Sequence, residues 1–381
     1  MEIKVSKMDL TEAIKKVTKA ISGKAIIPIL SGLHLVAKNN RLILTGSDSE
    51  LSIRTFLNVN EDEVDSIEIL QEGSIVLPAK KFERIIRSMP NKMITIKSKE
   101  DNKNQIEIIS GKSCFTLNGM AGDEYPKMPN IDGKGFSIKG MELKSLIERT
   151  IYAVSKSESK PILNGVKLFF ENGQLGMVAT DAYRLARVVG DIFQNETEET
   201  ITIPGNTLKE IPSLLSDSDE VLIKIASNQV VFKTENVYIL SRLLEGKYPE
   251  TDRLIPTDYK TLLTVDRKSF LGAIERSAIL AENDHPVVKL TITKENSGIF
   301  KSVELSHTSL ELGESKEQII VDEIEGEELT ISFNPNYMID ALKRIEEEKI
   351  IIEFNGAMRP FILKPFDKSN LIHLILPMRT Y

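Results

Sequence analysis

Residues that could carry out chemistry are scattered along this chain of 381 residues. Ser110-Gly111-Lys112-Ser113 resembles the end of a phosphate-binding loop, but that motif requires a glycine where Ile106 stands and a helix after it. An exposed turn is the expected structure there. The histidines are isolated from one another, at His34, His285, His307 and His373. With no paired nucleophile and base and no metal-ligand spacing, the sequence predicts neither an enzyme nor a bound metal or cofactor.

Cysteine usage and apolar runs predict a cytoplasmic protein. The single Cys114 forms no internal disulfide or thiolate metal site, which fits a reducing compartment. No apolar run follows the basic residues of the N-terminal MEIKVSKM, so no signal peptide is expected. The longest apolar stretches, 25–30 and 371–376, are too short to span a bilayer.

Charge is unevenly distributed along the sequence. Lysine and arginine number 49 and aspartate and glutamate 56, so the net charge is −7, which by itself argues against a nucleic-acid partner. Six predicted helices nevertheless hold 15 basic and 10 acidic residues, at 9–21, 79–89, 141–152, 205–215, 266–278 and 336–346. A basic layer on an acidic protein is compatible with holding a polyanion on that layer alone.

The chain contains three copies of one unit. Residues 3–48 align with 136–181 at a constant offset of 133, with identities such as Met8/Met141, Pro28/Pro161 and Asp48/Asp181. A third copy opens at Leu263–Phe270, and a second strand-then-helix pattern recurs at Ser74–Met89, Thr202–Leu215 and Thr330–Glu346. We expect three domains, at 1–128, 129–259 and 260–381.

Each unit reads as two helices with many strands. Leu10, Ile14, Val17 and Ile21 recur at helical spacing, whereas 42–44, 106–109 and 115–117 read as strands bounded by turn residues. Strands and helices do not alternate strictly, as they would in a parallel sheet. The prediction is an α+β fold with helices on one face of antiparallel sheets.

Basic residues are concentrated on the helices of the first unit. Few aromatic residues interleave with them, which favours phosphate contact without base readout. Charge alone is equally compatible with a solvated helix face. The basic positions are Lys15, Lys16, Lys19, Lys24, Lys80, Lys81, Arg84 and Arg87.

Together, the repeats and three short motifs resemble the bacterial sliding clamp family, the β subunits of DNA polymerase III. The motifs are Val178-Ala-Thr-Asp-Ala-Tyr-Arg-Leu-Ala186, Glu245-Gly-Lys-Tyr-Pro249 with Arg253 nearby, and Leu376-Pro377-Met378-Arg379. The resemblance covers essentially the whole chain. It implies a head-to-tail homodimeric ring that encircles double-stranded DNA without sequence readout, contacting it through Lys16, Lys24, Lys80, Arg84 and Arg87.

The resemblance also implies a groove between the second and third domains for a short hydrophobic motif. Its partners would be DNA polymerase catalytic subunits, the clamp loader, mismatch-repair proteins and other repair proteins. The groove residues would be Leu163, Thr180, Ala182, Tyr183, Arg184, Leu185, Pro249, Arg253, Leu254, Met358, Leu374, Leu376, Pro377, Met378 and Arg379. Apolar walls, a methionine rim and arginines suit such a peptide.

Asp181 is interpreted as a turn residue, because its counterpart Asp48 lies where no groove is expected. The sequence departs from the family pattern at Ala182-Tyr183, where Gly-His or Ser-His is common, and in the extension Thr380-Tyr381. Either change could alter the preferred peptide.

For the dimer, the resemblance places Phe115, on an edge strand, against Ile279 and Leu280 of the partner, with Cys114 near the interface. Buried packing within one chain would explain these residues equally well.

Two other functions compete with the clamp: an enzyme with a hidden site on this scaffold, and a peptide-binding adaptor that does not encircle DNA. The adaptor predicts no basic enrichment on the helices.

Overall fold

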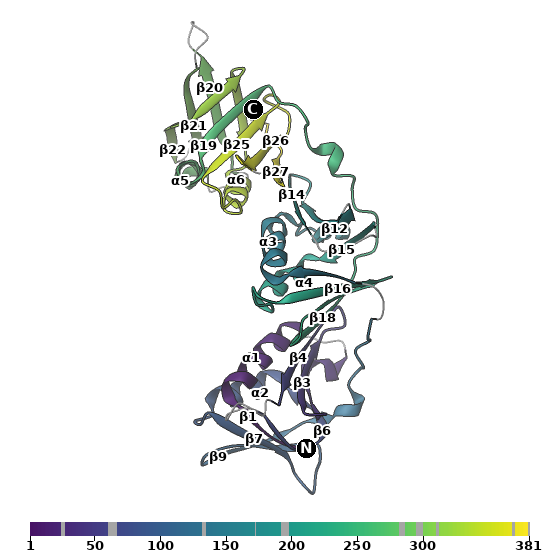
Figure 1. The fold of residues 1–381 in the computed structure, drawn as a ribbon. Helices are drawn as coiled ribbons and strands as arrows, with labels where there is room; N and C mark the ends of the chain where they lie inside the picture. Colours follow the sequence, from purple (N-terminus) through teal and green to yellow (C-terminus); the bar gives the residue numbers. More distant parts are fainter. Residues whose placement is uncertain are drawn as a thin grey trace. The chain divides into compact units, whose positions relative to one another are not determined.

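The computed structural model describes residues 1–23, 27–59, 67–131, 135–171, 173–191, 198–281, 286–294, 300–309, 312–367 and 370–379. The chain divides into two compact units (Figure 1). Unit 1 is Met1–Leu143 with Glu210–Leu243, and unit 2 is Lys144–Lys209 with Leu244–Tyr381. The central repeat therefore contributes to both units.

Unit 1 contains two antiparallel sheets. The smaller has the order β5-β1-β7-β8-β9 and comprises β1 (Glu2–Ser6), β5 (Glu68–Gln71), β7 (Met93–Ser98), β8 (Gln105–Ser110) and β9 (Ser113–Asn118). The larger has the order β10-β6-β2-β3-β4-β18-β17-β16-β11. Its strands are β2 (Gly32–Lys38), β3 (Arg41–Ser47), β4 (Leu51–Asn58), β6 (Gly73–Pro78), β10 (Met120–Ala121), β11 (Gly135–Lys139), β16 (Glu220–Ala226), β17 (Gln229–Lys233) and β18 (Val237–Arg242).

Unit 2 repeats this plan. Its nine-stranded sheet has the order β15-β12-β13-β14-β27-β26-β25-β19-β23, and its four-stranded sheet the order β22-β21-β20-β24. The strands are β12 (Gly165–Glu171), β13 (Gln174–Thr180), β14 (Arg184–Asp191), β15 (Glu199–Pro204), β19 (Thr261–Asp266), β20 (Val288–Lys294), β21 (Phe300–Ser309), β22 (Gly313–Ile319), β23 (Glu323–Gly326), β24 (Leu329–Phe333), β25 (Lys349–Phe354), β26 (Phe361–Pro365) and β27 (Leu371–Ile375).

Within the described ranges, six α-helices each follow a strand, which confirms the repeating strand-then-helix pattern. They are α1 (Lys7–Val17), α2 (Ala79–Ser88), α3 (Gly140–Thr150), α4 (Gly205–Glu210), α5 (Arg267–Ala278) and α6 (Pro335–Leu342). Helices α1 and α2 pack together in unit 1, as α5 and α6 do in unit 2 (Figure 1). In the described part of the chain, no helix is long and apolar enough to cross a membrane.

Helix α1 shows why these segments are helical and how they pack. The hydroxyl of Ser6 caps it by accepting a hydrogen bond from the Asp9 N–H, and Leu10, Ile14 and Val17 form its buried stripe. This face packs on β3 and β4. The antiparallel ladders and the helices packed against them confirm the predicted α+β class.

Two predicted features differ in detail. The helix expected at 205–215 ends at Glu210 and continues as a 3-10 turn, Ile211–Ser213, because Pro212 has no N–H to extend an α-helix. Segment 336–346 is likewise helical only to Leu342. The Ser110–Ser113 segment is a turn between β8 and β9 with Gly111 at φ 59°, which confirms the predicted turn.

A close approach between β3 and α1 generates a stability prediction. A Cβ added at Gly46 would lie 2.3 Å from the Val17 carbonyl oxygen and 2.8 Å from Ile21 Cγ1. We expect Gly46→Ala to lower the free energy of unfolding by about 2–3 kcal/mol, because backbone at the end of α1 must move. The measurement is urea unfolding followed by circular dichroism.

Gly272→Ala in α5 is the control, since its Cβ meets only the flexible Arg276 side chain. It should leave stability unchanged or raise it by up to about 1 kcal/mol. Equal midpoints for Gly46→Ala and the unmodified protein would contradict the prediction.

Candidate functional site

The turn between β13 and β14 carries several residues predicted for peptide binding. Asp181 Oδ1 accepts hydrogen bonds from the N–H groups of Tyr183 and Arg184 at 2.9 and 3.0 Å. The Thr180 hydroxyl accepts from the Ala182 N–H at 3.1 Å and donates to the Arg184 carbonyl at 2.6 Å. Ala182 has φ 76°, a left-handed conformation that a residue with Cβ rarely adopts. Asp181 therefore shapes the turn, which confirms its predicted role.

The first repeat contains the same turn. Asp48 Oδ1 accepts from the N–H groups of Glu50 and Leu51 at 3.0 and 2.8 Å, and Ser49 has φ 82°. The Ser49 N–H donates to the Ser47 hydroxyl, as Ala182 does to Thr180. The turn itself belongs to the scaffold, so any function specific to the second repeat resides in the side chains that it presents.

Arg184 is directed inward from this turn. Its guanidinium donates to Asp181 Oδ2 at 3.0 Å, to Asp340 Oδ2 at 2.6 Å and to the Tyr152 carbonyl at 2.9 Å. Its Cζ also lies 4.7 Å from the centre of the Tyr337 ring, and the side chain is only 11% exposed. Burial disfavours its charge, but the hydrogen bond to Asp340 and the charge of Asp181 outweigh burial and raise the pKa of Arg184. Arg184 is thus a positioning residue for the turn.

The neighbouring buried pair holds β27 to this network. The Tyr152 hydroxyl and His373 Nδ1 lie 2.7 Å apart and share a hydrogen bond. Burial, with the charges of Arg149 and Arg344, lowers the pKa of His373 to about 3, so the ring is neutral at neutral pH. Burial also raises the pKa of the Tyr152 phenol. A neutral, hydrogen-bonded His373 fits a structural role.

An apolar cluster lies beside the turn. It brings together three predicted groove residues, Leu163, Leu185 and Leu374, with Leu376 packed against them. Val178, Tyr248 and Ile362 complete the buried part and were not predicted as groove residues. Ile362 is placed opposite Leu374 by the pairing of β26 with β27, a long-range register that the sequence does not reveal.

The remaining predicted groove residues are more exposed. Tyr183, Leu254 and Met358 are exposed by 62%, 53% and 54%, which is unusual for large apolar side chains and favours a role in binding. The Leu376 N–H donates to the Tyr183 carbonyl and the Met378 N–H to the Ser332 carbonyl, which anchors the C-terminal segment. The others, Pro249, Arg253, Pro377 and Arg379, are exposed or half-buried. Thr380-Tyr381 lies outside the described residues.

A lysine-rich hollow of about 1600 Å³ lies beside α1 in unit 1. Its lining includes two carboxylates, Asp9 and Glu12, and five lysines: Lys7, Lys15, Lys16, Lys19 and Lys92. Lys7 donates to the Met89 carbonyl at 2.6 Å. Lys7 and Lys92 were not predicted, because they lie outside the helical segments from which charge was counted. The hollow has the electrostatics expected of an anion-binding surface.

The residues predicted to contact DNA differ in their pairing. Lys16 pairs with Glu12 at 3.0 Å and Arg87 with Glu83 at 2.7 Å, each one helical turn apart. Lys80 and Arg84 are exposed, and Lys80 lines a smaller hollow of about 410 Å³ with Lys81. Lys24 lies outside the described residues.

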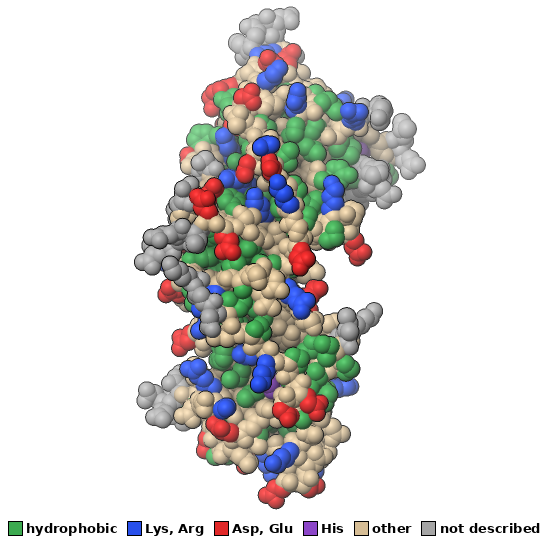
Figure 2. Space-filling model, turned by 90° about the vertical axis from the view of Figure 1, so that its right-hand side faces the viewer, with side chains coloured by type: hydrophobic (Ala, Val, Ile, Leu, Met, Phe, Trp, Pro, Cys, Tyr) green, Lys and Arg blue, Asp and Glu red, His purple; other side chains and the backbone are tan. Residues whose placement is uncertain are grey.

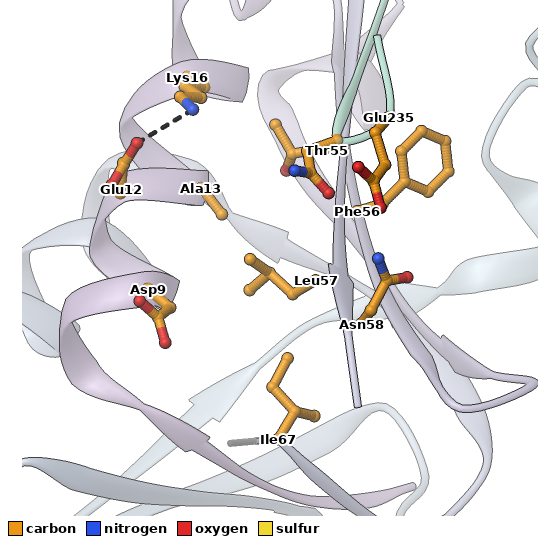
Figure 3. A pocket seen from close by; sticks show the side chains of 11 residues that line it. Asp9, Glu12, Ala13, Lys16, Thr55, Phe56, Leu57, Asn58, Ile67 and Glu235 are labelled. Carbon is orange, nitrogen blue, oxygen red and sulfur yellow. Dashed lines mark ion pairs between the residues drawn. The ribbon is translucent and has the colours of Figure 1, made fainter. Parts of the chain in front are cut away.

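A cavity of about 390 Å³ lies between α1 and β4 (Figure 3). Ala13, Leu57 and Ile67 point into it, and the carboxylates on it belong to Asp9, Glu12 and Glu235. Glu12 is paired with Lys16. No histidine or cysteine is among the described residues that line the cavity, and these described residues contain no group of acidic, histidine or cysteine side chains able to hold a metal ion. The cavity offers no paired nucleophile and base.

The predicted dimer residues are accessible in the single chain. Phe115 lies on β9, at the edge of its sheet, and is 42% exposed, while Ile279 is 61% exposed and Leu280 half-buried. Cys114 is exposed beside Phe115. Burial within one chain therefore does not account for Phe115 or Ile279.

The Arg184 network generates a second prediction. Arg184→Met leaves two carboxylates and a buried carbonyl without their donor, so we expect a loss of about 2–3 kcal/mol in the free energy of unfolding. Arg184→Lys should recover less than half, because an ammonium does not match the planar guanidinium geometry. Urea unfolding checks both variants.

Arg253→Met is the matched control, since that arginine side chain is 84% exposed and should change stability by less than about 0.5 kcal/mol. Equal stability of Arg184→Met and Arg253→Met would refute the positioning role.

Comparisons with known proteins agree along the whole chain. Family models for the DNA polymerase III beta subunit match residues 1–129 (N-terminal domain), 137–250 (central domain) and 252–379 (C-terminal domain). The chain is 42% identical to the beta sliding clamp of Bacillus subtilis (strain 168) over 385 residues and 41% identical to that of Staphylococcus epidermidis, with 100% of each chain covered.

Comparison with solved structures indicates the same family. The DNA polymerase sliding clamp of Bacillus subtilis matches with a TM-score of 0.95 at 41% identity, and that of Pseudomonas aeruginosa bound to griselimycin with 0.91 at 26%, each covering 100% of both chains. These matches extend over all three repeats and the apolar cluster beside the Asp181 turn. The chain therefore belongs to the beta sliding clamp family, the β subunits of DNA polymerase III.

Proposed function

We propose that this protein is the sliding clamp of a replication machinery: two copies close head to tail into a ring around duplex DNA. The ring tethers DNA polymerase catalytic subunits, the clamp loader and repair proteins, and it confers processivity without a catalytic site of its own. The observation that carries the proposal is the lysine-lined hollow beside α1 in a family member whose net charge is −7.

The charge distribution suits a ring that slides. Lysines contact phosphates as mobile point charges and read no sequence. Elsewhere, basic and acidic side chains are interspersed, as on the face in Figure 2. Lys16, Lys24, Lys80, Arg84 and Arg87 are the proposed DNA contacts. Retention then depends on encirclement, while each contact stays weak enough to exchange.

The same repeats support the proposed domains and dimer. We assign domains to 1–128, 129–259 and 260–381, since each contains the strand-helix pattern twice. Phe115 on edge strand β9 would meet Ile279 and Leu280 of the partner subunit, which would cover apolar surface that the single chain exposes. Because its ligand is duplex DNA, we place the protein in the cytoplasm at the nucleoid.

The peptide groove is proposed at the apolar cluster beside the Asp181 turn. Leu163, Leu185 and Leu374 form the floor, and exposed Tyr183, Leu254 and Met358 form the rim. Such a surface would bury leucine or phenylalanine anchors of a partner. We propose that the other residues predicted for the groove also contribute to it, except Arg184, whose buried side chain supports the turn. The basic hollow and the family membership favour the clamp over an adaptor that does not encircle DNA.

Topological retention tests the ring. The protein is loaded by a clamp loader onto nicked circular DNA, and the circle is then linearised. We expect the protein to stay on the circle through gel filtration and to leave the linear form within minutes. Equal retention on both forms would overturn encirclement. Lys80→Glu should weaken DNA contact without changing the dimer.

Truncation of two predicted groove residues in the C-terminal segment tests the groove. We expect Met378→Ala with Arg379→Ala to weaken binding of a fluorescent peptide with leucine and phenylalanine anchors by at least tenfold, because the anchors lose buried contacts. Fluorescence anisotropy measures the affinity. Met8→Ala is the control, since Met8 is 75% exposed and belongs to unit 1, whereas the groove cluster belongs to unit 2. Loss of the dimer in the Met378/Arg379 variant would contradict the assignment.

A further inference from the structure

A row of polar side chains crosses the nine-stranded sheet of unit 1. The register places His34 opposite Thr45, Thr45 opposite Arg54, and Arg54 opposite Tyr238. Residues directly opposite one another in an antiparallel ladder share a face. The adjacent Gly46 faces the end of α1, so this row lies on the other face of the sheet.

Few hydrogen-bonding or charged groups of the described residues compensate the charge of Arg54 in this row. Its Nε donates to the Thr45 hydroxyl at 3.2 Å, and its two Nη atoms form no hydrogen bond or ion pair with any residue that the structure describes. Burial lowers the pKa of Arg54, partly opposed by the nearby Tyr238 and Tyr125. A half-buried guanidinium that pairs with no carboxylate of the described residues is an incomplete arrangement, because those residues do not compensate the desolvation of its charge.

Two further polar groups beside Arg54, the Tyr125 hydroxyl and His34 Nε2, lack a hydrogen-bond partner in the part of the chain that the structure describes. Tyr125 stacks on His34 with ring centres 4.7 Å apart and is 4% exposed. Its hydroxyl lies near the Ser47 backbone, yet neither this hydroxyl nor His34 Nε2 completes a hydrogen bond of good geometry with a described residue. Burial and the charge of Arg54 lower the pKa of His34 to about 4, so the histidine is neutral at neutral pH. Arg54 is then the one charged member of the row.

The second repeat shows what occupies the equivalent position. In unit 2 the same row contains Lys167, Val178 and Arg187, at an offset of 133 from His34, Thr45 and Arg54. Arg187 Nε lies 3.3 Å from Asp252 Oδ1. Asp252 follows Tyr248 by four residues, and the residue four places after Tyr125 is Pro129. The second repeat supplies its own carboxylate, whereas the first has a proline in its place.

We propose that Arg54, Tyr125 and His34 form a carboxylate-binding site that takes an aspartate or glutamate side chain of a partner polypeptide. The bound carboxylate would occupy the place that the Asp252 side chain occupies beside Arg187. Its two oxygens accept from the free Nη groups of Arg54, and the Tyr125 hydroxyl and His34 Nε2 are additional donors. One guanidinium balances one carboxylate, whereas a phosphate dianion would require a second cation. A polypeptide is the proposed source because the occupant in the second repeat is a side chain of a segment crossing the same face of its sheet.

The His34 ring signal reports on this site in solution. The full-length dimer, labelled with ¹³C-histidine, is titrated with N-acetyl-aspartate amide and, in parallel, with N-acetyl-asparagine amide. We expect a saturable shift of the His34 signal with the aspartate compound alone and no shift of the buried His373. A capped Ala-Asp-Ala peptide should bind at least threefold more tightly than acetate. Equal affinity for the peptide and acetate would overturn a polypeptide as the ligand.

Three variants make the test specific. Arg54→Gln should abolish the saturable shift, and Arg187→Gln, the equivalent change in the second repeat, should leave it intact. Pro129→Asp keeps Arg54 and adds the internal carboxylate, so binding should weaken at least tenfold. A saturable shift with the asparagine compound, a shift that persists in Arg54→Gln, or unchanged affinity in Pro129→Asp would each refute the carboxylate site.

Discussion

Backbone pairing between consecutive repeats is the constraint on which the rest of the structure depends. Strand β4 pairs with β18 in unit 1, and β14 pairs with β27 in unit 2, so each nine-stranded sheet is shared between two repeats. A repeat by itself would leave these strands as unpaired edges with unsatisfied N–H and C=O groups. Side chains alternate between the two faces of a strand, so the same pairing decides which residues face the helices. In unit 1 the residues on the other face lie toward the segment that follows β10, which contains Tyr125. The polar row of Arg54 and the apolar cluster of Leu185 both result from this register.

The two equivalent sheet faces show how a repeated scaffold acquires different chemistry. Asp48 and Asp181 form the same turn with the same hydrogen bonds, so backbone geometry does not distinguish the repeats. The difference comes from the side chains around it. Val178 and Leu185 in the second repeat make an apolar wall, where the first repeat has Thr45 and Ser52 at the same offset. One face can therefore bury hydrophobic anchors, and the other presents a guanidinium.

Charge separation reconciles an acidic protein with a polyanionic ligand. Among the described residues, two carboxylates line the hollow with the five lysines, and one of these carboxylates pairs with Lys16. Lys19 pairs with Glu210, which leaves Lys7, Lys15 and Lys92 without a carboxylate partner among the described residues. Such a surface attracts phosphate by long-range electrostatics while holding it weakly at any one position. Weak, non-directional contacts suit a ring whose retention is topological. We expect the acidic remainder to reduce adhesion of DNA to other parts of the protein.

The sequence by itself determined the repeat count, the α+β class, the strand-then-helix order and the turn role of Asp181, because these depend on local periodicity and on self-similarity. Helix ends were less predictable, since Pro212 truncates a segment whose apolar spacing continues. Only the tertiary structure decided that Arg184 is directed inward and that Ile362 joins the apolar cluster beside the Asp181 turn. It also decided that Arg54 pairs with no carboxylate among the described residues, whereas Arg187 pairs with Asp252. Each of these depends on contacts between residues far apart in the chain, such as Arg184 with Asp340 or Arg187 with Asp252. Strand register sets those contacts, and register is a property of the assembled sheet that no single segment encodes.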